Sequence, residues 1–385
     1  MTDLMREQPR PSTPASPDPS ASADLQPAMS TPALMRALPG LFLVAVVGAG
    51  AVLSVLGDKG AKIWVRPVGQ SVMQGSAQAT FEHNYDAHHP VRDPGIDTWG
   101  LINYALFREG RPGVLIGDGD WLYTTEEFLT TPDDAREVTS KLQYIRQVRD
   151  QLAAHGTRLV VALVPAKARV YSEHLGRYRV PAVKAQVYQQ FLQRLAHLNI
   201  PAPNLQGALQ AAKPQGDVFL HTDTHWTPLG ASAAARSVAA SIRQHYPDLQ
   251  LPHNTFETTT RPATSYSGDL LSFVRVGALK DRMGPQREPL SIPATTRTDD
   301  AGGGLLGDDA VAVTLVGTSY SAIQSWNFEG ALKTAVASDV LNVSLEGKGP
   351  IVPMQQYLTS ETFRTQPPQL LIWEIPERFL DTPTP

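Results

Sequence analysis

The stretch Val311–Ser321 reads VAVTLVGTSYS and determines the fold class that we expect. Its first six residues form a nearly continuous apolar run, as in a strand that is buried on both faces. Gly317 then permits a tight turn, because it has no side chain to obstruct one. A serine directly after such a turn projects its hydroxyl from the sheet edge, and backbone N–H groups of a following helix can face a developing oxyanion. Ser319 is therefore a candidate nucleophile at the carboxyl end of a parallel strand, where open α/β sheets bind ligands.

Segments on both sides of this stretch alternate between short apolar runs and longer amphipathic ones. Further strands are predicted at Gly113–Ile116, Arg158–Leu163, Val340–Val343 and Gln369–Trp373. Helices are predicted at Asp133–His155, Val183–Leu198, Pro228–Tyr246, Ser325–Val336 and Pro353–Leu358. This alternation predicts an α/β fold with a parallel sheet that helices cover on both sides. Residues 255–310 are rich in Thr, Pro and Gly, so we expect a long insertion there and not core structure.

A second chemical motif is His221–Trp226, HTDTHW, just before Pro228. If this stretch is extended, residues two apart point the same way, so His221, Asp223 and His225 share a face. An aspartate beside a histidine can fix the imidazole tautomer and stabilise its charged form, which leaves the other nitrogen free to act as a base. Together with Ser319, the motif supplies a nucleophile, a base and an orienting carboxylate. The same three side chains could instead ligate zinc or iron, so a metal-dependent hydrolase is an alternative.

Composition excludes several classes of protein. The chain has 385 residues, of which 42% are hydrophobic and 18% charged, which suits a folded globular body. Its net charge is −4 and it has no basic stripe, so nucleic acid is not expected as a partner. Cysteine is absent, which excludes disulfides, thiol nucleophiles and cysteine-ligated metals.

The N-terminal region divides into two parts. Residues 1–37 are dominated by Pro, Ser and Ala and are predicted to be a disordered tail. Leu38–Gly57, LPGLFLVAVVGAGAVLSVLG, carries no charge and as a helix would span about 30 Å, so we expect a single-pass membrane anchor. Basic residues flank it about equally, and the positive-inside rule therefore gives no orientation. A cleaved signal peptide is the alternative, although no clear Ala-x-Ala site follows the apolar run.

Several stretches taken together resemble one known family. They are GDGDWLY at Gly117–Tyr123, DTHW at Asp223–Trp226, GTSYS at Gly317–Ser321, WEIPERFL at Trp373–Leu380 and the segment Asn327–Pro350. The chain resembles the alginate O-acetylation family of AlgJ and AlgX, whose catalytic domain is similar to the SGNH hydrolases. The likeness covers about residues 75–380. The order of Asp223, His225 and Ser319 looks like the circularly permuted motif order of that family. The resemblance thus implies an SGNH-like acetyltransferase domain over residues 60–385, facing the periplasm, with a cytoplasmic tail and an inner-membrane anchor.

The resemblance also implies roles for single residues. Ser319 would be the nucleophile, His225 its base and Asp223 the orienting partner of the base. Backbone N–H groups of Tyr320 and of Gly347, in the loop Glu346–Pro350, would form the oxyanion hole. Two departures stand out: Gly-Thr-Ser replaces the usual Gly-Asp-Ser, and no clear SGNH asparagine follows a strand.

The implied activity is O-acetylation of an exopolysaccharide, alginate-like or cellulose-like, through an acetyl-serine and without a cofactor. A membrane-bound O-acyltransferase would deliver the acetyl group. The alternatives are a polysaccharide acetyl esterase and a non-catalytic polysaccharide-binding scaffold. Trp226, beside the base, is expected to contact sugar, and Lys167, at a strand end, to steer an acidic polymer. Glu374 and Arg378 are expected to form a structural ion pair.

Overall fold

The computed structural model describes residues 33–56, 60–63, 73–299 and 311–383, which form two compact units, residues 1–92 and 93–385. The first unit contains helix α1 (Ala33–Leu56), in which the window Ala37–Ser54 has a mean hydropathy of 2.1. This helix is long and apolar enough to cross a membrane. It begins before Leu38 and so includes the last residues of the tail that we expected to be disordered. Residues 1–32 of that tail, and Gly57, lie outside the described residues.

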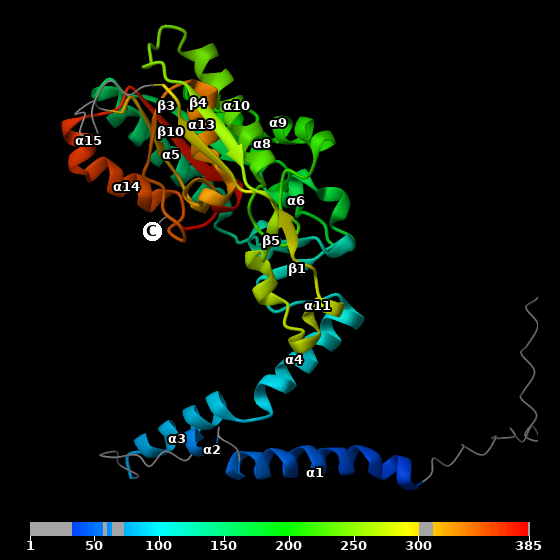
Figure 1. The fold of residues 1–385 in the computed structure, drawn as a ribbon. Coiled ribbons are helices and arrows are strands. Elements are labelled where there is room, and N and C mark those ends of the chain that lie inside the picture. Colours follow the sequence, from blue (N-terminus) through cyan, green and yellow to red (C-terminus); the bar gives the residue numbers. More distant parts are fainter. Residues whose placement is uncertain (1–32, 57–59, 64–72, 300–310, 384–385) are drawn as a thin grey trace, which may run out of the picture. The chain divides into compact units, whose positions relative to one another are not determined.

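The second unit is built on a four-stranded parallel sheet (Figure 1). Its order is β3 (Arg158–Val164), β10 (Leu370–Pro376), β8 (Val313–Val316) and β9 (Val340–Asn342). Every residue of β8 and β10 is buried. The continuous apolar runs of the sequence therefore correctly predicted strands covered on both faces. The largest difference in a strand bound is at the end of β10, which was predicted to end at Trp373 but continues through Glu374 to Pro376.

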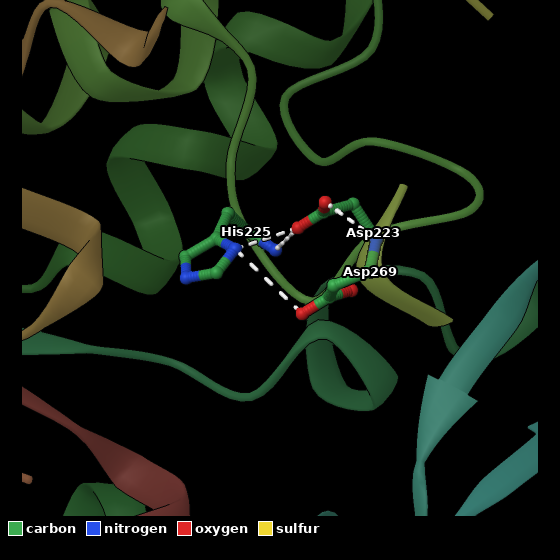
Figure 2. A group of neighbouring side chains, drawn as sticks. All are labelled: Asp223, His225 and Asp269. Carbon is green, nitrogen blue, oxygen red and sulfur yellow. Dashed lines mark hydrogen bonds and ion pairs between the residues drawn. The ribbon is translucent and has the colours of Figure 1, made fainter. Parts of the chain in front are cut away.

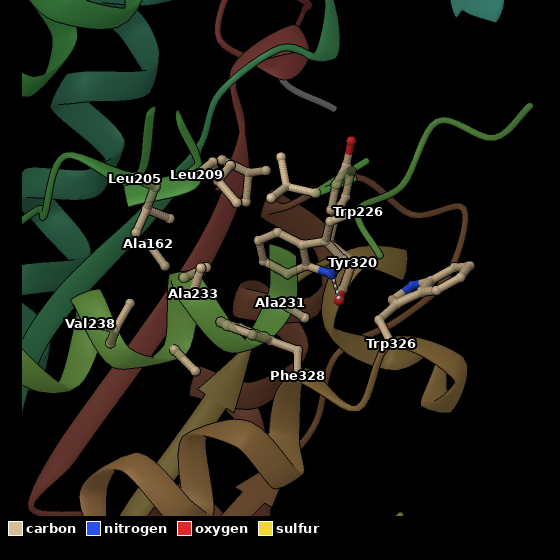
Figure 3. Packing of buried hydrophobic residues seen from close by; sticks show 14 of the residues in the cluster. Ala162, Leu205, Leu209, Trp226, Ala231, Ala233, Val238, Tyr320, Trp326 and Phe328 are labelled. Carbon is tan, nitrogen blue, oxygen red and sulfur yellow. Dashed lines mark hydrogen bonds between the residues drawn. The ribbon is translucent and has the colours of Figure 1, made fainter. Parts of the chain in front are cut away.

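Helices cover both faces of this sheet, as predicted. One face packs against α9 (Leu205–Ala212), α10 (Pro228–His245) and α13 (Phe328–Val336), and Figure 3 shows part of this core. The other face packs against α5 (Asp134–Ala154), α8 (Val187–His197) and α14 (Ile351–Thr359). Neighbouring residues of a strand serve opposite faces, so Ile372 joins the first core and Trp373 the second.

Three predicted elements differ from the structure. The helix expected over Val183–Leu198 is divided into α7 (Ala182–Ala185) and α8. The helix expected from Ser325 starts only at α13, because Asn327 adopts a left-handed conformation with φ of 53°, which asparagine tolerates better than most residues. The strand at β1 (Val114–Ile116) exists, but it pairs antiparallel with β2 (Leu122–Thr124) in a separate hairpin.

The region expected to be an insertion is described as far as residue 299 and has its own structure. It contains two antiparallel pairs: β4 (Phe256–Thr260) with β7 (Pro293–Arg297), and β5 (Thr264–Tyr266) with β6 (Glu288–Leu290). Between β5 and β6 the chain returns to the HTDTHW loop, where Gly268 lies so close to Thr222 that a Cβ would collide with its carbonyl group. The insertion is therefore packed directly against a loop that carries candidate site residues.

Candidate active site

Ser319 begins the short helix α12 (Ser319–Ala322) immediately after β8. Gly317 is required in this turn, since a Cβ there would lie 2.5 Å from the Glu374 carboxylate. Thr318 caps the helix with an extended backbone, and its hydroxyl accepts the N–H of Tyr320 at 3.4 Å. The strand, turn and helix predicted from VAVTLVGTSYS are thus confirmed.

The HTDTHW loop brings a histidine and an aspartate to this serine. His225 Nε2 lies 2.7 Å from Ser319 Oγ, and His225 Nδ1 lies 2.6 Å from Asp223 Oδ1. The loop folds back on itself, because Asp223 Oδ1 also accepts the backbone N–H of His225 at 2.9 Å. Asp223 is 1% exposed and His225 6%. An unbroken series of hydrogen bonds therefore runs from the serine hydroxyl through the imidazole to a buried carboxylate.

Two residues of the insertion complete the surroundings of this carboxylate, and sequence reasoning missed both. Asp223 Oδ2 accepts the hydroxyl of Tyr266 at 2.8 Å and the N–H of Asp269 at 2.9 Å. The Asp269 carboxylate in turn accepts the N–H and hydroxyl of Thr224, at 2.9 and 2.7 Å (Figure 2 shows Asp269 beside Asp223 and His225). No motif marks Tyr266 or Asp269, because they lie far along the chain in a segment whose composition indicated only loop.

These contacts determine the protonation state of Asp223. Burial by itself would raise its pKa, but the hydrogen bond and charge of His225 and the backbone N–H groups of Asp269 and His225 outweigh burial and lower the pKa to about 2. Burial and the neighbouring Asp223 raise the pKa of Tyr266, which therefore remains a hydrogen-bond donor. An ionised Asp223 can orient the imidazole and stabilise its protonated form.

Aromatic rings fix the imidazole from the side. The ring of Trp326 stacks on His225 with centroids 5.2 Å apart, and its Nε1 donates to the carbonyl of Ser319 at 3.3 Å. The ring of Tyr320 lies 4.8 Å from His225, and its hydroxyl donates to the carbonyl of Thr224 at 2.6 Å. Each aromatic residue thus joins the serine turn to the histidine loop.

Trp226 does not contact the surface, so the expectation that it binds sugar is wrong. Its side chain is fully buried, its ring packs on Phe328 at 4.7 Å, and its Nε1 donates to the carbonyl of Tyr320 at 3.2 Å (Figure 3). The residue belongs to the core beneath the site.

Lys167 is also buried, and the expectation that it steers a polymer is wrong as well. It is 1% exposed, and Nζ donates to the carbonyls of Leu122, His221 and Asp223 at 2.6, 2.9 and 3.0 Å. All three donors of the ammonium group are therefore used inside the protein. Burial lowers its pKa to about 8, although nearby carboxylates such as Glu127 favour the charged form.

The oxyanion assignments stay predictions. Tyr320 N–H faces the Thr318 hydroxyl, whereas Gly347 lies in an exposed turn after β9 with φ of 67°. Among the hydrogen bonds of the described residues, none joins Gly347 to the serine turn and none engages the N–H of Ser319. An asparagine does end a strand here, Asn342, but its amide donates to the carbonyl of Ser321 at 2.8 Å.

The metal-ligand set proposed from the sequence is not formed. His221 points away from Asp223 and His225: its Nε2 lies 2.8 Å from Asp217, and its ring stacks on Trp121. Asp223, His225 and Asp269 do have ligand atoms within 4.8 Å of one another. However, Asp223 and His225 bind each other directly through one carboxylate oxygen, and two donors occupy the other oxygen. A metal would have to break these bonds, so the residues do not fit a zinc or iron site.

Comparison with known proteins identifies the family of this chain. Residues 114–377 match the family model described as "SGNH hydrolase-like domain, acetyltransferase AlgX". The chain belongs to this family. It is therefore an O-acetyltransferase with an SGNH hydrolase-like domain, and the expected fold class and resemblance are confirmed.

Relatives of the AlgX family extend this result. The chain is 44% identical over 313 residues to a probable alginate O-acetylase AlgJ of Pseudomonas syringae pv. tomato, with 80% of each chain covered. The solved O-acetyltransferase domain of Pseudomonas putida AlgJ is 39% identical with a TM-score of 0.65, covering 71% of this chain and 94% of that one. Pseudomonas aeruginosa AlgX is 26% identical with a TM-score of 0.53, covering 76% and 66%.

Proposed function

We propose that this enzyme is a periplasmic O-acetyltransferase that acetylates alginate through an acetyl-serine at Ser319. The observation that carries the proposal is the hydrogen-bonded series Ser319–His225–Asp223, with links of 2.7 and 2.6 Å, in a chain of an acetyltransferase family. The curated relatives, named probable alginate O-acetylases, support alginate over a cellulose-like acceptor.

The first half-reaction loads the enzyme. His225 Nε2 accepts the hydroxyl proton of Ser319 while Oγ attacks the acetyl carbonyl of the donor. Asp223 holds Nδ1–H and stabilises the imidazolium that forms. The negative charge of the tetrahedral intermediate falls near the N–H of Ser319, to which backbone donors of Tyr320 or Gly347 would add. Collapse then expels the donor's leaving group, which takes the proton from His225.

The second half-reaction transfers the acetyl group. A sugar hydroxyl gives its proton to His225 Nε2 and attacks the acetyl-serine carbonyl, and the departing Ser319 Oγ recovers that proton. Water in place of the sugar would make the enzyme an acetyl esterase, and the outcome depends on orienting the sugar and excluding water. Membership in an acetyltransferase family supports transfer.

The proposed location is the inner membrane, with α1 as a single-pass anchor and the catalytic domain in the periplasm. Length and hydropathy of α1 support the anchor. A membrane-bound O-acyltransferase is the proposed donor partner, because an enzyme held at the bilayer surface can receive an acetyl group there. Polysaccharide is the acceptor.

The test is a transfer assay with the full chain in detergent, a chromogenic acetyl ester as donor and alginate oligosaccharides as acceptor. We expect acetylated oligosaccharide by mass spectrometry with wild type and none with Ser319→Ala. Release of acetate with no acetylated product would favour the esterase. Equal activity in Ser319→Ala would refute a serine mechanism, and sugar binding without any turnover would favour the scaffold.

A further inference from the structure

Glu374 is a carboxyl group in the middle of the sheet. It lies in β10, LLIWEIP, and is 0% exposed. Burying a carboxylate is costly unless other groups compensate for the lost water. The direct ion pair that we expected with Arg378 is not formed, since the Arg378 guanidinium pairs with Glu126 at 3.3 Å, although its positive charge still favours an ionised Glu374. Burial raises the pKa of Glu374 to about 7, and hydrogen bonds from Thr318 and Ser321 partly oppose that rise.

The hydrogen bonds that Glu374 accepts among the described residues all come from the turn around Ser319. Oε2 accepts the N–H of Thr318 at 2.7 Å and the hydroxyl of Ser321 at 3.1 Å. The hydroxyl of Thr318 contacts both carboxylate oxygens, at 3.0 and 3.2 Å. Gly317 lies directly against the same carboxylate, with no room for a Cβ. One side chain of the neighbouring strand therefore holds the residues on both sides of Ser319.

The position of Ser319 follows from these contacts. Its backbone lies between Thr318 and Ser321, which are both tied to Glu374, while its Oγ must stay 2.7 Å from His225 Nε2. The Thr318 hydroxyl donates to Glu374 and accepts the N–H of Tyr320, so the carboxyl group also orients a candidate oxyanion donor. Displacement of a reacting group by about 1 Å can cost about a hundredfold in rate.

We infer that Glu374 is a positioning residue for acetyl transfer, and that Thr318 occupies the aspartate position of the SGNH motif because Glu374 lies beneath it. A threonine offers this carboxyl group a donor. An aspartate would place a second carboxylate against a buried one, and like charges in one buried site repel. Gly317, Thr318 and Glu374 thus form one unit that carries Ser319. The inference rests on the proposed role of Ser319 as nucleophile.

The decisive experiment is a double-mutant cycle in the full-length enzyme, with Thr318→Asp, Glu374→Gln and the double variant. Thr318→Asp is expected to lower kcat about a hundredfold with little change in KM for the donor. In the double variant the amide introduced at position 374 can donate to the carboxylate introduced at position 318 and still accept the backbone N–H of that residue. We therefore expect it to recover at least about tenfold of the lost kcat, far beyond additivity. A double variant no more active than Thr318→Asp would overturn the inference.

The matched control is Glu377→Gln, which alters another buried carboxylate directly after the same strand. Glu377 pairs with Arg169 and accepts the N–H of Ala166, and none of its hydrogen bonds or ion pairs within the described part of the chain reaches the serine turn. Thr318→Asp combined with Glu377→Gln is expected to show additive effects on kcat. If Thr318→Asp does not fold, Glu374→Gln and Glu374→Leu replace it. We then expect kcat to fall severalfold in the first and about a hundredfold in the second, at unchanged KM. Wild-type kcat in folded Glu374→Leu would refute positioning.

These outcomes are separate from the fate of the proposed function. If Ser319→Ala kept full activity, the serine mechanism would fail, whatever the Glu374 variants do. If Ser319→Ala were inactive while the Glu374 and Thr318 variants behaved additively, only the positioning role would fail.

Discussion

The two halves of the candidate triad rest on buried groups of opposite charge. Beneath the serine half lies the carboxyl group of Glu374, which accepts from the N–H and hydroxyl groups of the turn. Beneath the Asp223–His225 half lies the ammonium group of Lys167, which donates to two carbonyls of the HTDTHW loop and to that of Leu122 in β2. Backbone outside regular ladders must find other partners when it is buried. A turn that exposes N–H groups inward thus needs an acceptor, and a loop that exposes carbonyls inward needs a donor.

Lys167→Met tests directly whether the Asp223–His225 half depends on a buried donor, and we expect the largest effect from this variant. The carbonyls of Leu122 and Asp223 would lose the donor that Lys167 supplies, whereas that of His221 keeps the N–H of Leu122. Each unsatisfied buried group costs about 1–3 kcal/mol unless water replaces it. We expect the free energy of unfolding to fall by at least about 2 kcal/mol, and kcat to fall about a hundredfold because Asp223 shifts. Chemical denaturation and initial rates measure the two effects.

The control for this variant is Lys213→Met. Lys213 is partly exposed and donates to the carbonyl of Val170, remote from the triad in its contacts. We expect the free energy of unfolding of Lys213→Met to fall by less than about 1 kcal/mol and its kcat to be unchanged. Equal losses of unfolding free energy and of kcat in the two variants would show that Lys167 has no special role beneath the triad.

Removal of the Tyr266 hydroxyl should have a smaller effect. Tyr266→Phe leaves Asp223 Oδ2 with one donor, and a hydrogen bond to a charged group contributes about 1.5–3 kcal/mol. We expect kcat to fall about tenfold, with acetyl-donor KM unchanged. A variant with wild-type kcat would mean that the insertion merely covers the triad. Thr258→Val, on the exposed strand β4 of the same insertion, is the control and should leave kcat unchanged.

The smallest expected effect is on acid stability. The folded pKa of Asp223 is about 2, below its ordinary value of 3.8. Its stabilising contribution is therefore fully present above pH 3.8 and is lost as pH falls towards 2. Denaturation curves between about pH 5 and pH 2 should show a steeper loss in wild type than in Asp223→Asn. If wild type and Asp223→Asn lost stability equally over this pH range, the lowered pKa of Asp223 would be contradicted.

Sequence predicted the parts of the site in which one short segment contains its own signal. VAVTLVGTSYS combines an apolar strand with a glycine turn, and that order of residues is enough to place Ser319 at a sheet edge. HTDTHW places Asp223 two residues before His225, and the structure does put them in contact. The alternating spacing of His221, Asp223 and His225 did not predict the direction of the His221 side chain, which points the other way and contacts Asp217.

The remaining features depend on contacts between distant segments. Tyr266 and Asp269 lie in a segment with no apolar periodicity, so nothing in the sequence ties them to Asp223. A lysine after a strand, or a tryptophan beside a catalytic histidine, looks the same in sequence whether it faces solvent or the core, which is why Lys167 and Trp226 were misjudged. Glu374 was misread for the same reason, because its partners Thr318 and Ser321 lie in the turn and short helix that follow the adjacent strand β8.

The central claim is that Ser319 carries the acetyl group. The most direct measurement is rapid acid quenching of the full-length enzyme with acetyl donor and no acceptor, followed by peptide mapping. We predict one added acetyl group on the peptide containing Ser319 in wild type, its disappearance when alginate oligosaccharide is added, and no such adduct in Ser319→Ala. A wild-type enzyme that turns over donor while the Ser319 peptide stays unmodified at every quench time would contradict the account.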